Sequence, residues 1–115
     1  MIKMIYGKRI DVQYVGAYNT KYYSFKDVCD LLDFDGKERT QLGRKVANLD
    51  SVKIPFKTRN GAIKEKTYCS ILAVSFLIDQ SKKRMKRFIK RSFYNNNNNK
   101  KSILCYIIEK INNLF

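Results

Sequence analysis

An Asn60-Gly61 pair between two alternating segments constrains the fold of this chain more than any other feature. Residues 52–58 and 62–69 alternate between apolar and polar side chains, a pattern typical of β-strands. Asn-Gly favours the two-residue type I′ turn of a hairpin. Pro55 has no N–H to donate, so we expect its strand to lie at the edge of a sheet.

The type I′ turn also predicts which hairpin residues face each other. It places Lys57 opposite Lys64, so that four lysines share one face with Arg59 at the tip. The four are Lys53, Lys57, Lys64 and Lys66. Such a face would suit a wing lying along a nucleic-acid backbone. The alternative is an edge hairpin that its lysines protect against aggregation.

The segments before this hairpin predict a second hairpin and two helices. Residues 10–15 alternate as a strand, residues 16–21 carry turn residues, and Tyr22 begins the returning strand. Ser24 is a candidate N-cap for a helix that ends at residues 35–36. A second helix is expected over residues 37–48, with Leu42, Val46 and Leu49 on its apolar side.

The segments after the central hairpin predict further helices. Residues 71–78 are almost continuously apolar and indicate a buried helix that ends near residue 80. A basic helix should follow to about Phe93 and dock through an apolar stripe of Met85, Phe88, Ile89 and Ser92.

Taken together, these elements predict a small α+β domain. It has an N-terminal hairpin, short helices, a central wing-like β-hairpin and C-terminal helices. We expect a body over residues 1–94, a poly-asparagine hinge over residues 95–99 and an amphipathic helix over residues 100–115. The apolar face of that last helix should not stay exposed, so we expect it to pack on a second copy of the chain, as a homodimer, or back on the body of its own chain.

The net charge of +14 points to a polyanionic partner. Seven of the ten residues 82–91 are cationic, and no acid lies between residues 80 and 108. One-signed surfaces of this kind attract nucleic acid, whose phosphates they neutralise. The candidate phosphate contacts in this segment are Lys83, Arg84, Lys86, Arg87, Lys90 and Arg91.

The second predicted helix is the candidate for reading base edges. Its far side carries Lys37, Gln41 and Arg44, and such side chains make the hydrogen bonds that readout in the major groove requires. The alternative is an ordinary solvated helix face.

The chain offers no recognisable catalytic, cofactor or metal motif, and we expect a non-enzymatic protein. It contains no histidine, and its three cysteines are widely spaced, so a zinc site or disulfide framework is not expected. The acids at residues 27–38 lack the order of a calcium-binding loop. No apolar run is long enough to span a bilayer, and no secretory signal is evident.

Several motifs resemble the BRO N-terminal domain, a relative of the KilA-N domain found in large DNA viruses and phages. Residues 22–34, with their tyrosine pair and lysine-aspartate-valine helix start, are similar to the opening of that family. Residues 75–83 with Phe88 resemble its leucine-rich helix and basic helix. Asp33 stands where the family has glycine.

The resemblance covers about residues 10–93 and implies a viral protein that binds double-stranded DNA. It also implies a regulator of transcription or replication in the host nucleus or at cytoplasmic replication sites. Three other functions stay open: a module that grips an acidic host protein, a peripheral membrane binder, and a small nuclease using the acidic helix.

Overall fold

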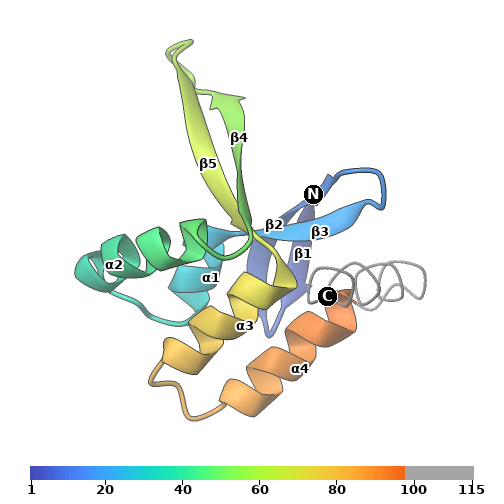
Figure 1. The fold of residues 1–115 in the computed structure, drawn as a ribbon, viewed down its shortest axis with the longest axis vertical. Coiled ribbons are helices and arrows are strands. Elements are labelled where there is room, and N and C mark those ends of the chain that lie inside the picture. The colour runs from blue at the N-terminus through green and yellow to red at the C-terminus, as the bar shows by residue number, and fades with distance from the viewer. Residues whose placement is uncertain (98–115) are drawn as a thin grey trace.

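The computed structural model describes residues 1–97, which form an α+β domain with one five-stranded sheet (Figure 1). Its elements in chain order are β1 (Ile2–Ile5), β2 (Lys8–Val15), β3 (Thr20–Ser24), α1 (Phe25–Leu31), α2 (Gly36–Ala47), β4 (Ser51–Lys57), β5 (Ile63–Cys69), α3 (Ile71–Gln80) and α4 (Lys86–Asn97). The predicted fold class is confirmed.

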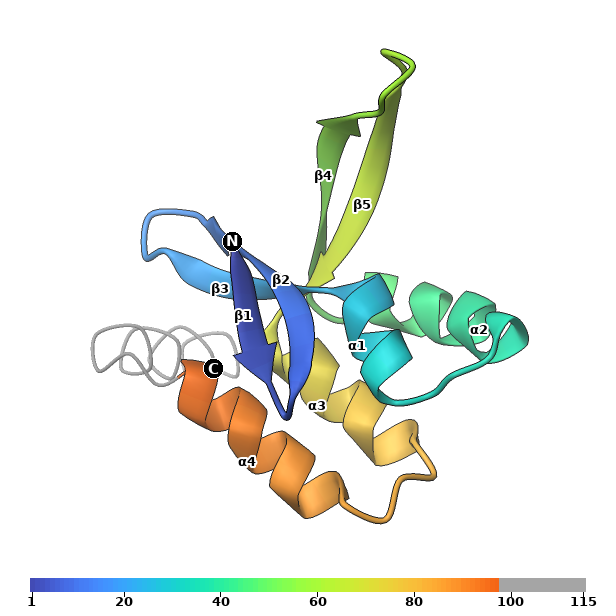
Figure 2. The same ribbon diagram turned by 180° about the vertical axis from the view of Figure 1, so that it is seen from behind.

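The strands follow the order β1-β2-β3-β5-β4, and every neighbouring pair is antiparallel. β4 is therefore an edge strand, as Pro55 predicted. The outer part of β4 and β5 extends well beyond the rest of the sheet as a free hairpin, whereas α3 and α4 lie together on the other side of the molecule (Figures 1 and 2).

The core lies between the sheet and helices α1, α3 and α4, and α2 adds Leu42 and Val46 to it. Alternation along β2 and β3 turns Ile10, Val12 and Tyr23 inward, and all three are fully buried. α4 contributes Phe93, whose ring meets Tyr23 edge-to-face with centroids 5.2 Å apart. α3 is buried along most of its length, as its apolar sequence predicted. β3 is the middle strand of the sheet, and its Tyr23 packs against α4.

The sequence did not reveal β1, which pairs with β2 through a two-residue turn. Tyr6 and Gly7 both have positive φ, 50° and 74°, as a type I′ turn requires. This turn places Ile5 beside Lys8 in register and buries the Ile5 side chain. A type I′ turn is thus found at Tyr6-Gly7 and not at the predicted Asn60-Gly61 pair.

The predicted register of the central hairpin was wrong by one residue. The N–H of Gly61 donates to the carbonyl of Thr58 at 3.0 Å, and Gly61 takes φ of 82°. This is a three-residue loop with glycine in the left-handed position, which Asn-Gly also suits. The strands therefore pair Phe56 with Lys64 and Lys57 with Ile63.

The new register overturns the predicted four-lysine face. Paired residues share a face of a hairpin, and the two faces alternate along each strand. Lys53 and Lys57 lie on one face, whereas Lys64 and Lys66 lie on the other. The hairpin therefore carries cations on both sides.

The boundary between the first two helices also differs from the prediction. Ser24 caps α1 as expected, accepting a bond from the Asp27 N–H at 3.3 Å. However, Asp35 begins α2 as its N-cap and forms a capping box with Glu38, so residues 35–36 start a helix rather than end one. Asp33, at φ of 57°, makes the turn between the helices in a conformation that favours glycine.

The predicted docking stripe of α4 is right at Ile89 and wrong at Met85 and Phe88. Residues 82–85 precede the helix, and Met85 and Phe88 are 45% and 48% exposed. Ile89 and Phe93 are the buried anchors, one helical turn apart. Leu49, expected on the apolar side of α2, is also exposed.

Part of the predicted asparagine hinge is helical. α4 continues through Asn97, and the Asn96 side chain accepts a bond from the Tyr23 hydroxyl at 3.1 Å. The Asn96 carbonyl accepts a second bond from the buried Lys21 ammonium. The remaining hinge residues, the predicted last helix and the predicted dimer contact lie outside the described residues.

Candidate nucleic-acid interface

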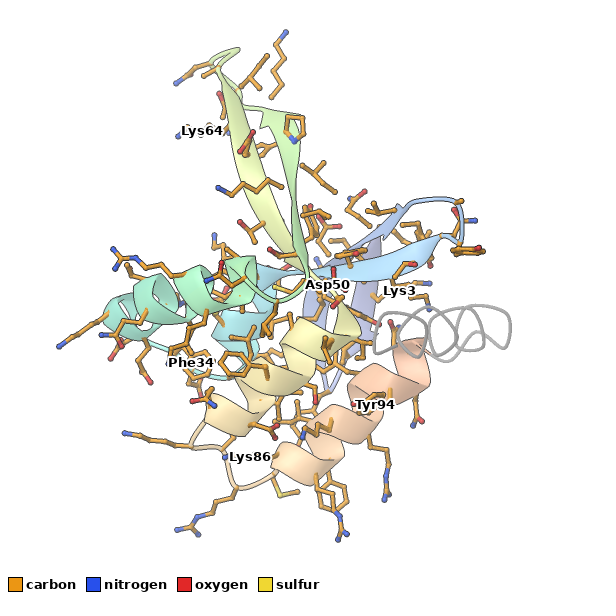
Figure 3. The ribbon with its side chains drawn as sticks, viewed as in Figure 1. Lys3, Phe34, Asp50, Lys64, Lys86 and Tyr94 are labelled. Atoms are coloured by element: carbon orange, nitrogen blue, oxygen red, sulfur yellow. The ribbon has the colours of Figure 1, made fainter. Side chains whose placement is uncertain are left out.

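The predicted phosphate contacts fall into two groups at opposite ends of the molecule. Lys64 lies far out on the hairpin and Lys86 lies at the start of α4, at the two ends of the long axis (Figure 3). The hairpin and the basic helix therefore form two separate surfaces.

The hairpin is anchored to the body at its base by a carboxylate. Asp11 on β2 accepts a hydrogen bond from the Tyr68 hydroxyl at 2.6 Å and lies 3.5 Å from the Lys66 ammonium. On the other strand, the Tyr22 hydroxyl donates to Asp50 at 3.0 Å. These bonds hold the base of the hairpin on both sides.

The anchor has a defined protonation state. Burial alone would raise the pKa of Asp11, but bonds from Tyr68 and the N-terminal ammonium, with the nearby charge of Lys66, bring it below its ordinary value. Burial and the Asp11 carboxylate together raise the pKa of Tyr68 to about 12. A charged carboxylate and a neutral phenol are therefore the forms that hold the hairpin at neutral pH.

The other cations of the hairpin are open to solvent. Lys53, Lys57, Arg59 and Lys64 are exposed, and none forms an ion pair within residues 1–97. Glu65 is the single acid between residues 51 and 69. The outer hairpin is thus a cationic ribbon.

Helix α2 leads into the hairpin and shows an acid-free stripe. Leu42 and Val46 are buried, and Gly43 faces the ring of Phe25. The opposite side is exposed along the helix at positions spaced by three or four residues. These residues are Lys37, Gln41, Arg44 and Asn48. The predicted far side of this helix is confirmed as exposed.

The basic segment before and within α4 is less open than its sequence indicated, because acids from other elements pair with two of its four lysines. Lys83 pairs with Asp33 at 2.6 Å, and Lys90 pairs with Asp79 at 2.5 Å. The Lys86 ammonium donates to the Asp79 carbonyl at 3.1 Å. By contrast, Arg84, Arg87 and Arg91 are exposed and form no ion pair within the described residues.

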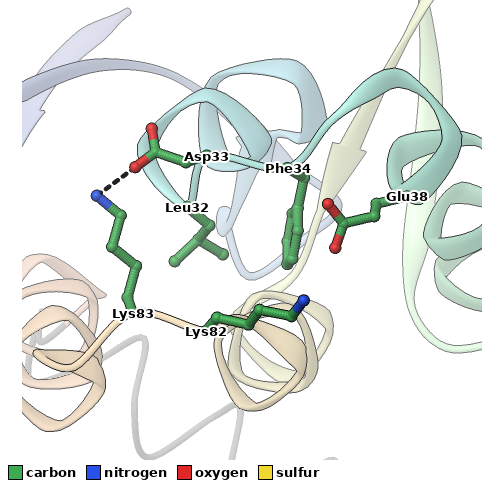
Figure 4. A pocket seen from close by; sticks show the side chains of 6 residues that line it. All are labelled: Leu32, Asp33, Phe34, Glu38, Lys82 and Lys83. Carbon is green, nitrogen blue, oxygen red and sulfur yellow. Dashed lines mark ion pairs between the residues drawn. The ribbon is translucent and has the colours of Figure 1, made fainter.

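A hollow of about 200 Å³ lies between this segment and the turn before α2 (Figure 4). Its wall includes Asp33 and Glu38 on one side and Lys82 and Lys83 on the other. The bond from Lys83 holds the pKa of Asp33 below its ordinary value. Both signs of charge meet here, so the hollow does not extend the cationic surface.

The described residues contain no cluster of histidine, cysteine or acidic side chains that would hold a metal ion. Cys29 and Cys69 are buried free thiols, and burial raises the pKa of each to about 12. Both thiols are therefore neutral and serve as small core residues.

Sequence reasoning missed the residues that hold the hairpin in place. Asp11 and Tyr68 are 57 positions apart, and no local pattern connects them. It also missed that Met85 and Phe88 are exposed, because their helical spacing favoured burial.

Comparisons of the chain with family models, curated proteins and solved structures found no match. The resemblance to the BRO N-terminal domain therefore remains a prediction from sequence motifs. Within residues 1–97, no helix has both the length and the apolar character needed to cross a bilayer.

Proposed function

We propose that this protein is a non-enzymatic nucleic-acid-binding protein whose ligand is duplex DNA. The observation that carries the proposal is the projecting β4–β5 hairpin, whose two faces carry cations that form no ion pair in the described part of the chain. A two-stranded ribbon fits the major groove of B-form DNA, where a phosphate backbone runs along each side. Lys53 and Lys57 would face one backbone, and Lys64 would face the other.

Helix α2 supports the same proposal from the other side of the hairpin base. Its exposed stripe combines cations with amide side chains, the mixture that contacts phosphates and base edges. Gln41 and Asn48 suit adenine, and Arg44 suits guanine. We propose that α2 supplies sequence reading and the hairpin supplies most of the affinity.

The proposal includes the viral setting that the BRO resemblance implies, with a role in transcription or replication. It revises the part played by α4. Lys86, at the start of that helix, lies at the opposite end of the molecule from Lys64, so a duplex held by the hairpin does not need this end (Figure 3).

The test is fluorescence anisotropy of a labelled duplex across a salt series, with two variants of equal charge. One replaces three hairpin cations: Lys57→Gln, Arg59→Gln and Lys64→Gln. The matched control replaces three cations at the other end: Arg84→Gln, Arg87→Gln and Arg91→Gln. Loss of three phosphate contacts should flatten the slope of log affinity against log salt by roughly 2.7.

We expect the hairpin variant to lose this slope and the control to keep it. Equal losses in both variants would mean that binding follows net charge alone, and the proposed interface would be wrong. Single-stranded DNA and RNA of the same length, measured in parallel, test the choice of duplex DNA.

A further inference from the structure

A second surface lies at the start of α4, and its composition differs from that of the hairpin. We call the exposed residues Arg84, Met85, Arg87, Phe88 and Arg91 the α4 surface. The guanidinium carbon of Arg91 lies 6.0 Å from the centre of the Phe88 ring. This surface therefore combines three arginines that form no ion pair within residues 1–97 with two half-exposed apolar side chains.

The arrangement is selective in which side chains it leaves open. α4 buries Ile89 and Phe93 in the core, so Phe88 and Met85 are not needed for docking the helix. The neighbouring lysines bond to the acidic residue Asp79, while the arginines project outward. Arginine, methionine and aromatic residues are the types enriched in protein interfaces.

We propose that the α4 surface binds an acidic protein segment that carries apolar side chains. Carboxylates of the partner would accept paired hydrogen bonds from the guanidinium groups, a geometry that arginine favours over lysine. An apolar side chain of the partner would cover Phe88 and Met85. This partner goes beyond the proposed DNA ligand and does not depend on it.

Other occupants fit this surface less well. Phosphates of a duplex would satisfy the arginines but leave Phe88 and Met85 uncovered. A bilayer would need a wider apolar face, because the main apolar side of α4 is packed into the core. The chain's own residues 100–115 carry three lysines and one acid, so their charge opposes docking here.

The hairpin and the α4 surface are far enough apart for each to hold a ligand without hindering the other. Lys86 beside the α4 surface and Lys64 on the hairpin lie at opposite ends of the long axis (Figure 3). Exposed charges are screened over about 8 Å at physiological salt. DNA on the hairpin and an acidic segment on α4 should therefore bind at the same time.

The experiment uses the full chain and two labelled polymers of equal length, poly-glutamate and a random copolymer of glutamate and tyrosine. We expect the copolymer to bind about tenfold more tightly than poly-glutamate, as a buried aromatic contact would provide. Phe88→Ser with Met85→Ser should remove this preference. The triple arginine variant used above should weaken both polymers, and the hairpin variant should leave the copolymer preference unchanged.

Competition then separates this proposal from the DNA proposal. A preformed complex with duplex DNA should still take up the copolymer. Equal binding of the two polymers, or a preference that survives the Phe88 variant, would overturn the proposal. Displacement of the copolymer by single-stranded DNA would assign the surface to nucleic acid, and displacement by phosphatidylserine vesicles would assign it to lipid. If the protein binds the copolymer but does not bind duplex DNA, the proposal for the hairpin is wrong and the proposal for the α4 surface stands.

Discussion

Both cationic ends of this protein are rich in lysine and arginine, but they differ in what surrounds these side chains. The outer hairpin touches little of the body, and its exposed cations have no acidic partners within residues 1–97. The start of α4 rests on the core, and Asp33 and Asp79 neutralise part of its charge. The number of cations in a segment therefore does not measure the charge that a ligand meets.

The largest expected difference between the two ends is in stability. Phe93→Ala should lower the free energy of unfolding by about 3–5 kcal/mol, because the ring is fully buried against Tyr23. Phe56→Ala on the hairpin should change it by less than about 0.5 kcal/mol, since that ring is 45% exposed. Urea unfolding of both variants measures the contrast. Similar losses would show that the hairpin is packed as firmly as α4.

A smaller effect is expected at the base of the hairpin. Asp11→Asn should destabilise the protein by about 1–3 kcal/mol, because Tyr68 loses a charged acceptor. The folded pKa of Asp11 lies below its ordinary value of 3.8. Its contribution is therefore complete above pH 3.8 and is lost as the pH falls through the folded pKa.

Unfolding measured between pH 6 and pH 2 tests this sign. The difference in stability between wild type and Asp11→Asn should shrink as the pH falls, since asparagine does not ionise. Asp33 also has a lowered pKa but is present in both proteins, so it cancels. A difference that stays constant across the range would contradict the charged anchor.

The smallest expected effect on stability is at the α4 end. Asp79→Asn breaks the pair with Lys90, which is partly exposed, and should cost at most about 1 kcal/mol. It should nevertheless tighten binding of the glutamate-tyrosine copolymer, because Lys90 is released beside the α4 surface. The salt slope for duplex DNA should not change. A changed DNA slope would mean that the two ends are not independent.

Much of the fold could be predicted because local signals agreed with the tertiary structure. Pro55 indicated an edge strand, Ser24 capped a helix, and the apolar run from Ile71 marked a buried helix. β1 could not be predicted, because four residues at the N-terminus gain their strand structure from pairing with β2. The predicted register of the central hairpin was wrong because Asn-Gly suits both a two-residue and a three-residue loop.

The candidate site was predictable in its residue types and not in its geometry. The exposed stripe on α2 followed from helical periodicity. The neutralising acids did not, because Asp33 reaches Lys83 across 50 positions of sequence. The prediction of which face of α4 is buried was partly wrong for a related reason. Helical spacing alone allows several apolar faces, and only the position of the sheet decides which of them packs.

The contact of Asn96 with β3 has a consequence for how this gene can vary. Runs of one amino acid change length readily when the repeated codons slip during replication. Phe93 is buried and fixes α4 just before the asparagine run at residues 95–99. Asn96 is the second residue of that run. Any run that keeps at least two asparagines therefore keeps an asparagine at position 96, opposite Tyr23 and Lys21. A shorter or longer run therefore keeps this bond to the sheet, provided that two asparagines remain.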